Sequence, residues 1–329
     1  MAYFLGVDGG QTSTACAVCD DTGRILGVGH GGPSNHILAP GGEARARSAV
    51  ETALTAAESV AGLQRVEFSG AHFGMTGINR DTEQARVFAR VASSLLSARI
   101  VQIDNDASIA LAGALACRPG VIVIAGTGSI AFGRDPSNRE ARVGGWGYLF
   151  GDEGSAFAIG LAGVRAALRA QDGIGPPTVL ESRIPWHFGR RLAEIPVLYY
   201  EERLQRPDIA AAAPVVTAAA AAGDAVASSL VAEAAQGLAA VAAAVITQLT
   251  WPDGAVPVAP VGGVFKAGPV ILNPLKAALA ARVPGAVLVP ARFTPVVGGL
   301  LFALQAAGVA HTPERLALLA ATWELRSAG

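Results

Sequence analysis

Asp8-Gly9-Gly10-Gln11-Thr12, which follows the apolar run Tyr3 to Val7, is the stretch that decides the fold. Its two glycines let the backbone turn tightly enough for consecutive N–H groups to point at one anion. The carboxylate before them can hold a hydrated cation. The pattern therefore predicts a phosphate-binding turn between two strands. An ordinary glycine hairpin would carry the same residues, so the motif needs support from the rest of the chain.

The chain repeats this arrangement. Strands are expected at 3–7, 14–18 and 24–28 in the first copy, and at 121–125, 129–134 and 139–143 in the second. Gly126-Thr127-Gly128-Ser129 then stands where the first copy has its glycine turn. A repeat of this length indicates two copies of one domain, because solenoid repeats span only about 20 to 50 residues. Two equivalent turns could hold one polyphosphate.

Between and after the copies, strands alternate with helices. We expect helices at 41–63 and 81–96, a strand that ends at 74–77, a strand at 99–103, a largely helical stretch over 155–249 and a strand at 256–261. Such alternation is typical of α/β proteins with a helix-covered mixed sheet in each domain. With 329 residues, two domains are expected. We place them at 1–118 and 119–304, followed by a C-terminal helix, 305–329, that we expect to pack back on the first domain.

The composition narrows the class of protein. With 51% hydrophobic and 16% charged residues the chain is globular, and its formal net charge of -1 offers no concentrated positive field for nucleic acid. The N-terminus lacks the pattern of a signal peptide, and the apolar tract Ile209 to Ala222 is too short to span a bilayer. We therefore expect a cytoplasmic protein without membrane or nucleic-acid partners.

The chain has three cysteines, Cys16, Cys19 and Cys117, an odd number that fits reduced thiols better than a disulfide framework. Cys16 and Cys19 form a CxxC pair. On the strand expected there, positions i and i+3 point to opposite faces, so the two thiolates could not easily share one metal. We interpret them as core residues.

A third candidate is Asp104-Asn105-Asp106, at the end of an apolar strand and the start of a helix. Ligands collect at strand ends in α/β sheets, and a carboxylate there can take a proton from an attacking hydroxyl during phosphoryl transfer. In isolation, Asp106 could equally be a helix N-cap. No GxxxxGK[ST] pattern occurs and the chain has only two lysines, Lys266 and Lys276, so a P-loop is excluded.

A fourth candidate is Gly144-Gly145-Trp146-Gly147 with Gly151-Asp152-Glu153-Gly154-Ser155. Dense glycine around two acids and an aromatic ring is typical of a pocket for a polar ring compound. A structural interpretation also remains open, in which Trp146 belongs to the core and the acids cap the next helix.

At these four places the chain closely resembles the N-acetylglucosamine kinase and BadF/BadG-type ATPase family of the sugar kinase, Hsp70 and actin superfamily. The most specific match is the segment from Gly144 to Ser155. The resemblance implies two duplicated RNase H-like, actin-like ATPase domains, with a mixed sheet in each and a cleft between them. It also implies ATP and Mg²⁺ as cofactors.

The resemblance implies roles for individual residues of this chain that match the family's motifs. Asp106 is similar to the catalytic base, and Asp8 to the residue that holds Mg²⁺ through water. The two glycine turns resemble the phosphate motifs, and Gly262-Gly263-Val264-Phe265 resembles the adenosine motif. The sugar contacts implied by the resemblance are Asn35, Thr127 and Asp152, and we add Gly145 and Trp146 from the fourth candidate segment. Ile130 departs from some acetylglucosamine kinases, which have a polar sugar contact there.

The function implied is ATP-dependent transfer of the γ-phosphate to a hydroxyl, O6, of N-acetylglucosamine or a related amino sugar or hexose. One alternative is a glucosamine kinase. Another is a BadF-type ATPase that activates an electron-transfer enzyme, but such activators place cysteines near the second phosphate motif, and 121–134 has none. We expect no structural metal, and a homodimer formed by the Ala-rich helical lobe.

Overall fold

The computed structural model describes residues 2–64, 66–79, 81–252 and 254–327. The chain divides into two compact units. Unit 1 comprises 1–118 and 291–329, and unit 2 comprises 119–290. The first boundary lies where the sequence suggested it. The second differs from the expected residue 304, because the helix Pro295–Ala306 packs on the first sheet.

Unit 1 holds a five-stranded sheet of order β3-β2-β1-β5-β7. Its strands are β1 (Tyr3–Gly9), β2 (Thr14–Asp20), β3 (Ile25–Gly31), β5 (Gly70–Met75) and β7 (Val101–Asn105), and β4 (Glu67–Phe68) pairs with β6 (Ser97–Ala98) in a small second sheet. The helices are α1 (Gly42–Ala61), α2 (Glu83–Leu95), α3 (Asp106–Leu115), α11 (Pro295–Ala306) and α12 (Pro313–Ser327).

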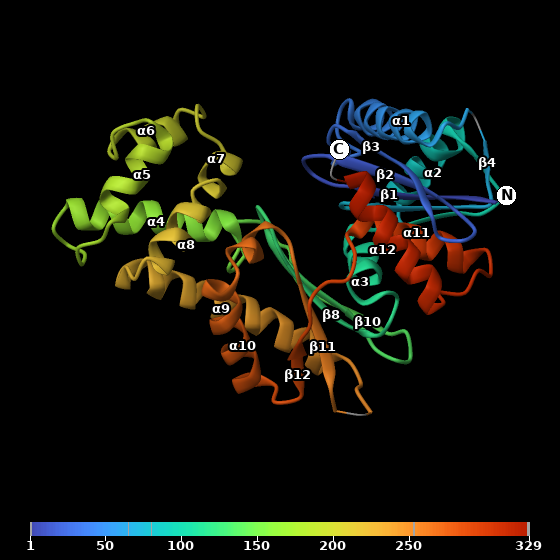
Figure 1. Ribbon diagram of the computed structural model, residues 1–329. Coiled ribbons are helices and arrows are strands. Elements are labelled where there is room, and N and C mark those ends of the chain that lie inside the picture. Colours follow the sequence, from blue (N-terminus) through green and yellow to red (C-terminus); the bar gives the residue numbers. More distant parts are fainter. Residues whose placement is uncertain (1, 65, 80, 253, 328–329) are drawn as a thin grey trace. The chain divides into compact units, whose positions relative to one another are not determined.

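The two faces of this sheet are covered by helices from opposite ends of the chain (Figure 1). α1 and α2 pack on one face, and α11 and α12 pack on the other. The backbone N–H of Ile25 donates to the hydroxyl of Thr322 at 3.0 Å, so a hydrogen bond joins α12 to β3. The expected packing of the C-terminal helix against the first domain therefore occurs.

The glycine and alanine content has a packing reason in unit 1. A Cβ on any of three alternate glycines of β3 would collide with a backbone carbonyl of α1. These pairs are Gly27 with Ala57, Gly29 with Ala53 and Gly31 with Ala49. Side chains on one face of a strand recur every two residues, and those on one face of a helix recur nearly every four. The row of glycines on β3 therefore stays opposite the row of alanines on α1. Small residues on both sides let backbone pack directly on backbone.

Unit 2 repeats the sheet of unit 1, with order β10-β9-β8-β11-β12. Its strands are β8 (Gly120–Ala125), β9 (Ser129–Arg134), β10 (Glu140–Gly144), β11 (Val256–Val261) and β12 (Ala286–Leu288). In both sheets the first three strands are antiparallel and the later two add in parallel. This identity of order and direction confirms the duplicated α/β fold expected from the sequence.

The hairpin turns repeat as well. In unit 1 the carboxylate of Asp20 accepts the backbone N–H groups of Thr22 and Arg24 at 2.9 and 3.1 Å. In unit 2 the carboxylate of Asp135 accepts those of Ser137 and Arg139 at 2.9 and 3.0 Å. An aspartate at this position stabilises a tight turn by replacing the missing backbone acceptor.

Helices make up the rest of unit 2 (Figure 1). It contains α4 (Ala156–Gln171), α5 (Leu180–Phe188), α6 (Glu194–Tyr200), α7 (Arg206–Ala210), α8 (Ala213–Ala221), α9 (Ala225–Gln248), the 3₁₀ helix η1 (Gly263–Ala267) and α10 (Pro269–Arg282). Among the described residues one helix, α9, has the length and apolar composition to cross a bilayer. Leu238 and Val245 of α9 are buried in the core of unit 2, which accounts for that apolar composition.

The CxxC pair lies on β2, as expected. Cys16 packs in the cluster under α1, whereas Cys19 packs in the cluster under α11 and α12. Burial raises the pKa of both thiols above the ordinary range, which keeps them protonated. The two thiols therefore belong to opposite cores and do not form one metal site.

Candidate active site

Three aspartates lie at the carboxyl end of the first sheet. Asp8 lies near the end of β1, beside Gly74 of β5, and Gly74 in turn pairs with Asp104 of β7. Asp106 begins α3 directly after β7. Parallel strands end at the same edge, so strands distant in sequence bring these acids together.

Asp106 is not the N-cap of its helix. The cap is Asn105, whose side-chain oxygen accepts the backbone N–H of Ser108 at 2.7 Å. Asp104 is buried, and one of its carboxylate oxygens accepts the backbone N–H of Asn105 at 2.9 Å. Asp106 is the first helical residue and is partly exposed. The alternative role for Asp106, that of helix cap, therefore belongs to Asn105.

The acids influence one another. Burial, and in second place the charge of Asp106, raise the pKa of Asp8 from its ordinary value of 3.8 to about 7. Two carboxylates this close repel each other when both are ionised. A divalent cation would relieve that repulsion, and oxygen donors are the ligands that Mg²⁺ prefers. The donor set around the first turn thus fits such an ion.

The loop that carries Asn35 is tied to the first glycine turn. The backbone N–H of Ser34 donates to the carbonyl of Gly10 at 3.2 Å. The guanidinium of Arg45 donates to the carbonyl of Asn35 at 2.7 Å. His36 follows in the left-handed region at φ 53°. These contacts hold Asn35 at a fixed place beside the turn that contains Gln11 and Thr12.

The second glycine turn is anchored by the Gly151 to Ser155 segment. The backbone N–H of Ser129 donates to a carboxylate oxygen of Asp152 at 3.1 Å, and the Ser129 hydroxyl donates to the carbonyl of Glu153 at 2.7 Å. Ser155, and neither acid, caps α4 by accepting the N–H of Ala158. Asp152 is only 3% exposed, so in this structure it faces protein groups.

A pocket of about 530 Å³ opens beside this turn, entirely within unit 2. Gly126 and Thr127 line one side, and Gly263, Val264 and Lys266 line another. The remaining wall is made by small residues of α7 and α8 and by α4, namely Ala156, Ile159, Pro207, Ala210, Ala211, Ala213, Pro214 and Thr217, with Ala267 of η1. Of the motifs anticipated from sequence, the second glycine turn and the segment from Gly262 to Phe265 therefore contribute to one pocket.

The rest of the adenosine motif supports the pocket from behind. Gly262 has φ 114°, and a Cβ there would lie 2.5 Å from the carbonyl oxygen of Ala125. Glycine is required, because the end of β11 touches the end of β8 at this point. Phe265 packs on the hydrophobic core.

Gly145 and Trp146 follow β10. The N–H of Gly145 donates to the carbonyl of Ser129 at 3.1 Å, which joins this segment to the second turn. Trp146 is 73% exposed, and the guanidinium of Arg142 lies 5.8 Å from its ring centroid. The interpretation of Trp146 as a core residue is therefore wrong.

Sequence reasoning missed two cations of unit 2. Lys266 had been noted only as one of two lysines, yet it lines the pocket. Arg206 pairs with Asp152 at 2.5 Å. Neither residue carries a local signal. The nearest one is Gln205-Arg206-Pro207-Asp208, a helix start with a capping box, which says nothing about what Arg206 contacts.

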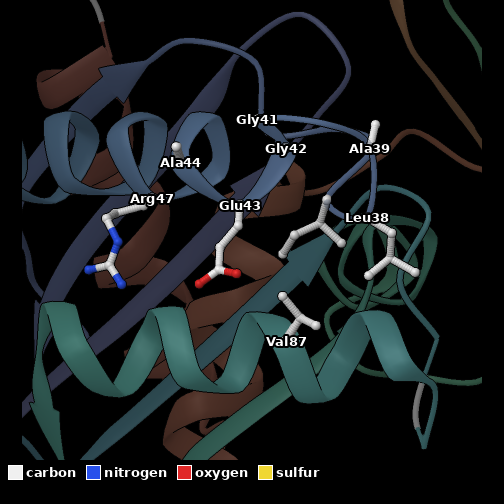
Figure 2. A pocket seen from close by; sticks show the side chains of 9 residues that line it. Leu38, Ala39, Gly41, Gly42, Glu43, Ala44, Arg47 and Val87 are labelled. Carbon is white, nitrogen blue, oxygen red and sulfur yellow. The ribbon is translucent and has the colours of Figure 1, made fainter.

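A second pocket of about 550 Å³ lies in unit 1, between the start of α1 and α2. Figure 2 shows Glu43 and Arg47 of α1 and Val87 of α2 around it, with Leu38 at one end. It includes none of the residues proposed from the motifs. Within the described residues, no group of three His, Cys, Asp or Glu side chains could hold a metal on its own.

Known proteins resemble this chain over most of its length. Residues 5–303 match the model of the BadF/BadG/BcrA/BcrD ATPase family. The chain is 32% identical over 266 residues to an N-acetylmuramic acid/N-acetylglucosamine kinase of Clostridium acetobutylicum, covering 80% of this chain and 86% of that protein. It is 31% identical over 236 residues to the glucosamine kinase GspK of Vibrio cholerae, covering 71% and 77%.

A solved structure shows the same fold. A Chromobacterium violaceum protein, proposed to be an N-acetylglucosamine kinase, is similar with a TM-score of 0.72 and 28% sequence identity, over 92% of this chain and 98% of that one. The family model spans both glycine turns, Asp106 and the adenosine motif, which confirms the resemblance read from the residues. The chain belongs to the BadF/BadG/BcrA/BcrD ATPase family.

Proposed function

We propose that this protein is an ATP-dependent kinase that transfers the γ-phosphate to a hydroxyl of an amino sugar, at O6. The observation that carries the proposal is the position of Asp106. It is the first residue of α3, it is partly exposed, and it acts electrostatically on Asp8 at the end of β1. Because Asn105 supplies the helix cap, we assign the role of general base to the Asp106 carboxylate.

Proton transfer, sugar binding and adenosine binding each involve particular residues. Asp106 takes the proton from the sugar hydroxyl. The hydroxyl oxygen of the sugar bonds to the γ-phosphorus, and the bond between that phosphorus and the bridging β-phosphate oxygen breaks, which releases ADP. Asn35, Gly145 and Trp146 are the sugar contacts we propose, joined by Thr127 and Asp152. The pocket of unit 2 receives the adenosine.

The charges of the phosphates need partners. Backbone N–H groups of the two glycine turns supply part of the compensation, and Lys266 in the pocket supplies another. Mg²⁺ held by Asp8 through water would neutralise charge that develops on the transferred phosphoryl group. The raised pKa of Asp8 supports this assignment, because such a carboxylate gains from a nearby cation.

Amino sugars are the substrates we favour, because the relatives above are kinases of N-acetylmuramic acid, N-acetylglucosamine and glucosamine. A panel of these sugars with glucose and ATP, scored by ADP release and by mass of the product, tests the proposal. Phosphorylation of at least one amino sugar is expected. ADP release that is independent of every sugar would contradict it.

The iron–sulfur alternative has no support from the thiols. Cys16 and Cys19 are buried on opposite faces of β2, and burial raises their pKa values. We propose a cytoplasmic location, where ATP is abundant and free thiols stay reduced. The homodimer expected from the sequence stays a prediction, which light scattering with size-exclusion chromatography would test.

A further inference from the structure

Arg206 comes from a part of unit 2 that is distant in sequence from the motifs. It begins α7, which follows α4, α5 and α6 in the chain, yet its side chain reaches the second glycine turn. Its side chain is 23% exposed, and that of its partner Asp152 is 4% exposed. The pair is therefore an ion pair largely withdrawn from water, where one charge without the other is costly.

The guanidinium makes two polar contacts with one nitrogen. Nη2 donates to Asp152 Oδ2 at 2.5 Å and to the carbonyl of Thr127 at 3.2 Å. The other carboxylate oxygen of Asp152 accepts the N–H of Ser129 at 3.1 Å. Arg206 and Asp152 thus hold the glycine turn from both ends.

The guanidinium lies over two aromatic rings. Its central carbon lies 5.3 Å from the ring centroid of Tyr148 and 5.8 Å from that of Phe157. A guanidinium stacks on such rings, whereas an ammonium does not present a flat face. The Nε atom is buried and has no hydrogen-bond partner in the described part of the chain. The rings and the two acceptors together determine where the side chain lies.

The space around Gly128 shows how tight the arrangement is. A Cβ at Gly128 would lie 2.9 Å from Arg206 Nη2 and 3.0 Å from both carboxylate oxygens of Asp152. The pair therefore lies directly against the turn. An ionised Asp152 without its partner would put negative charge beside the place where phosphates bind, and like charges repel strongly where water is scarce.

We propose that Arg206 is a positioning residue for the phosphates of ATP. It neutralises Asp152 and fixes the carbonyl of Thr127, so the second glycine turn meets the phosphates in one shape and without uncompensated negative charge. Arg206 acts through the turn and through Asp152. This inference rests on the proposed kinase function only for its link to catalysis, because ATP binding follows from the family.

The test compares AMP-PNP with adenosine, which lacks phosphates, by equilibrium dialysis in the presence of Mg²⁺. In Arg206→Met, AMP-PNP should bind about tenfold more weakly, as expected for loss of a charge-assisted hydrogen bond. Adenosine should bind within about twofold of the wild type, because it does not reach the charged part of the turn. A variant that merely loosens unit 2 would weaken both ligands alike.

Two further variants sharpen the test. In Arg206→Met combined with Asp152→Asn, AMP-PNP affinity should recover to within about threefold of the wild type, because the unpaired charge is gone. Arg206→Lys keeps the charge and loses the stacking, so AMP-PNP should bind about threefold more weakly. The matched control is Arg203→Met, which removes an exposed partner of Glu201 in the same segment and should change neither ligand.

Several outcomes overturn the proposal. One is AMP-PNP affinity within about twofold of the wild type in a folded Arg206→Met. Another is an equal loss of adenosine binding. Should Arg206→Met fail to fold, Arg206→Lys decides by the same two ligands. A wild type that binds AMP-PNP but phosphorylates no sugar would contradict the proposed function alone, and the variants would still decide the role of Arg206.

Discussion

The two glycine turns connect equivalent strands in the two sheets, yet their surroundings differ in charge. Each turn is closed by one backbone hydrogen bond of 2.9 Å, from Gly10 to Ser13 and from Gly126 to Gly128. Beside the first turn lie Asp8 and Asp106, two acids that interact unfavourably. Beside the second turn the acid, Asp152, is paired with Arg206.

This difference in charge indicates that the two copies of the domain serve different functions. A pair of acids at the first turn suits proton transfer and cation binding, because both require negative charge. A neutralised turn that borders a pocket suits the binding of a nucleotide, since phosphates avoid bare carboxylates. The two turns thus share one backbone fold, and the side chains around each turn determine what that turn can bind.

The largest effect is expected from Asp106→Asn, which removes the base from the first turn and leaves the second intact. The kcat for sugar phosphorylation should fall about 10³-fold, because an amide cannot take the proton of the hydroxyl. AMP-PNP affinity should stay within a few-fold of the wild type. Steady-state kinetics and dialysis measure the two quantities. Near wild-type turnover would show that another group is the base.

The pH dependence of Mg-nucleotide binding should follow Asp8 at the first turn. Its pKa is raised to about 7, so the affinity for Mg-AMP-PNP should rise about tenfold between pH 6 and 8 as the carboxylate ionises. Asp8→Asn should bind weakly at both pH values. Calorimetry at the two pH values measures this change. In Asp106→Asn the rise should move to lower pH, because the charge that helps to raise the pKa of Asp8 is gone.

Asp8 should also affect folding stability with a defined sign. Its folded pKa lies above the ordinary value of 3.8, so between these pH values the folded protein holds a proton that the unfolded chain releases. The contribution of Asp8 to the free energy of unfolding should therefore fall as the pH rises from about 4 to about 7, and then level off. Urea unfolding of the wild type and Asp8→Asn at pH 5 and 8 tests this. The variant should gain stability relative to the wild type at pH 8, and an opposite sign would show that Asp8 gains stabilising partners when ionised.

A smaller effect is expected from Gly262→Ala, which disturbs the shape of the second site without changing its charge. The new Cβ would press on the carbonyl of Ala125 at a φ of 114°, so we expect a loss of about 2 kcal/mol in the free energy of unfolding. The KM for ATP should rise several-fold. Gly268→Ala is the control: its φ is 66° and its Cβ would have no neighbour within 4 Å. Equal losses in both variants would show that backbone strain alone matters.

The smallest effect is expected from Trp146→Ala. The ring is 73% exposed, so its loss should change the free energy of unfolding by no more than about 0.5 kcal/mol. The KM for the sugar should rise about threefold, in keeping with loss of one exposed stacking contact. An unchanged KM would remove Trp146 from the proposed sugar contacts. A change in the KM for ATP alone would assign it to the nucleotide side.

Much of the fold could be predicted because its signals are local. The expected strands at 129–134 and 256–261 coincide with β9 and β11, and the helix at 41–63 with α1 to within two residues at its end. Alternating apolar residues and glycine turns mark such elements. The placement of α11 in unit 1 could not be predicted. Its sequence is apolar throughout, so nothing local says which sheet it covers.

The site shows the same limit. Asn105 and Asp106 are neighbours of similar chemistry, and sequence could not say which one caps α3. The second turn was recognised, but its anchor in Arg206 was not, because that residue lies in a segment with no motif of its own. A contact between residues 54 positions apart leaves no local pattern to read.

By itself the sequence determined the duplicated strand order, the two glycine turns and the family, because backbone turns and hydrophobic alternation depend on neighbours in the chain. Only the tertiary structure decided that burial and the charge of Asp106 raise the pKa of Asp8, and that Asp152 is neutralised by Arg206. The physical reason is that charge interactions depend on distance and burial in space. Both quantities are set when strands and helices far apart in the chain pack together.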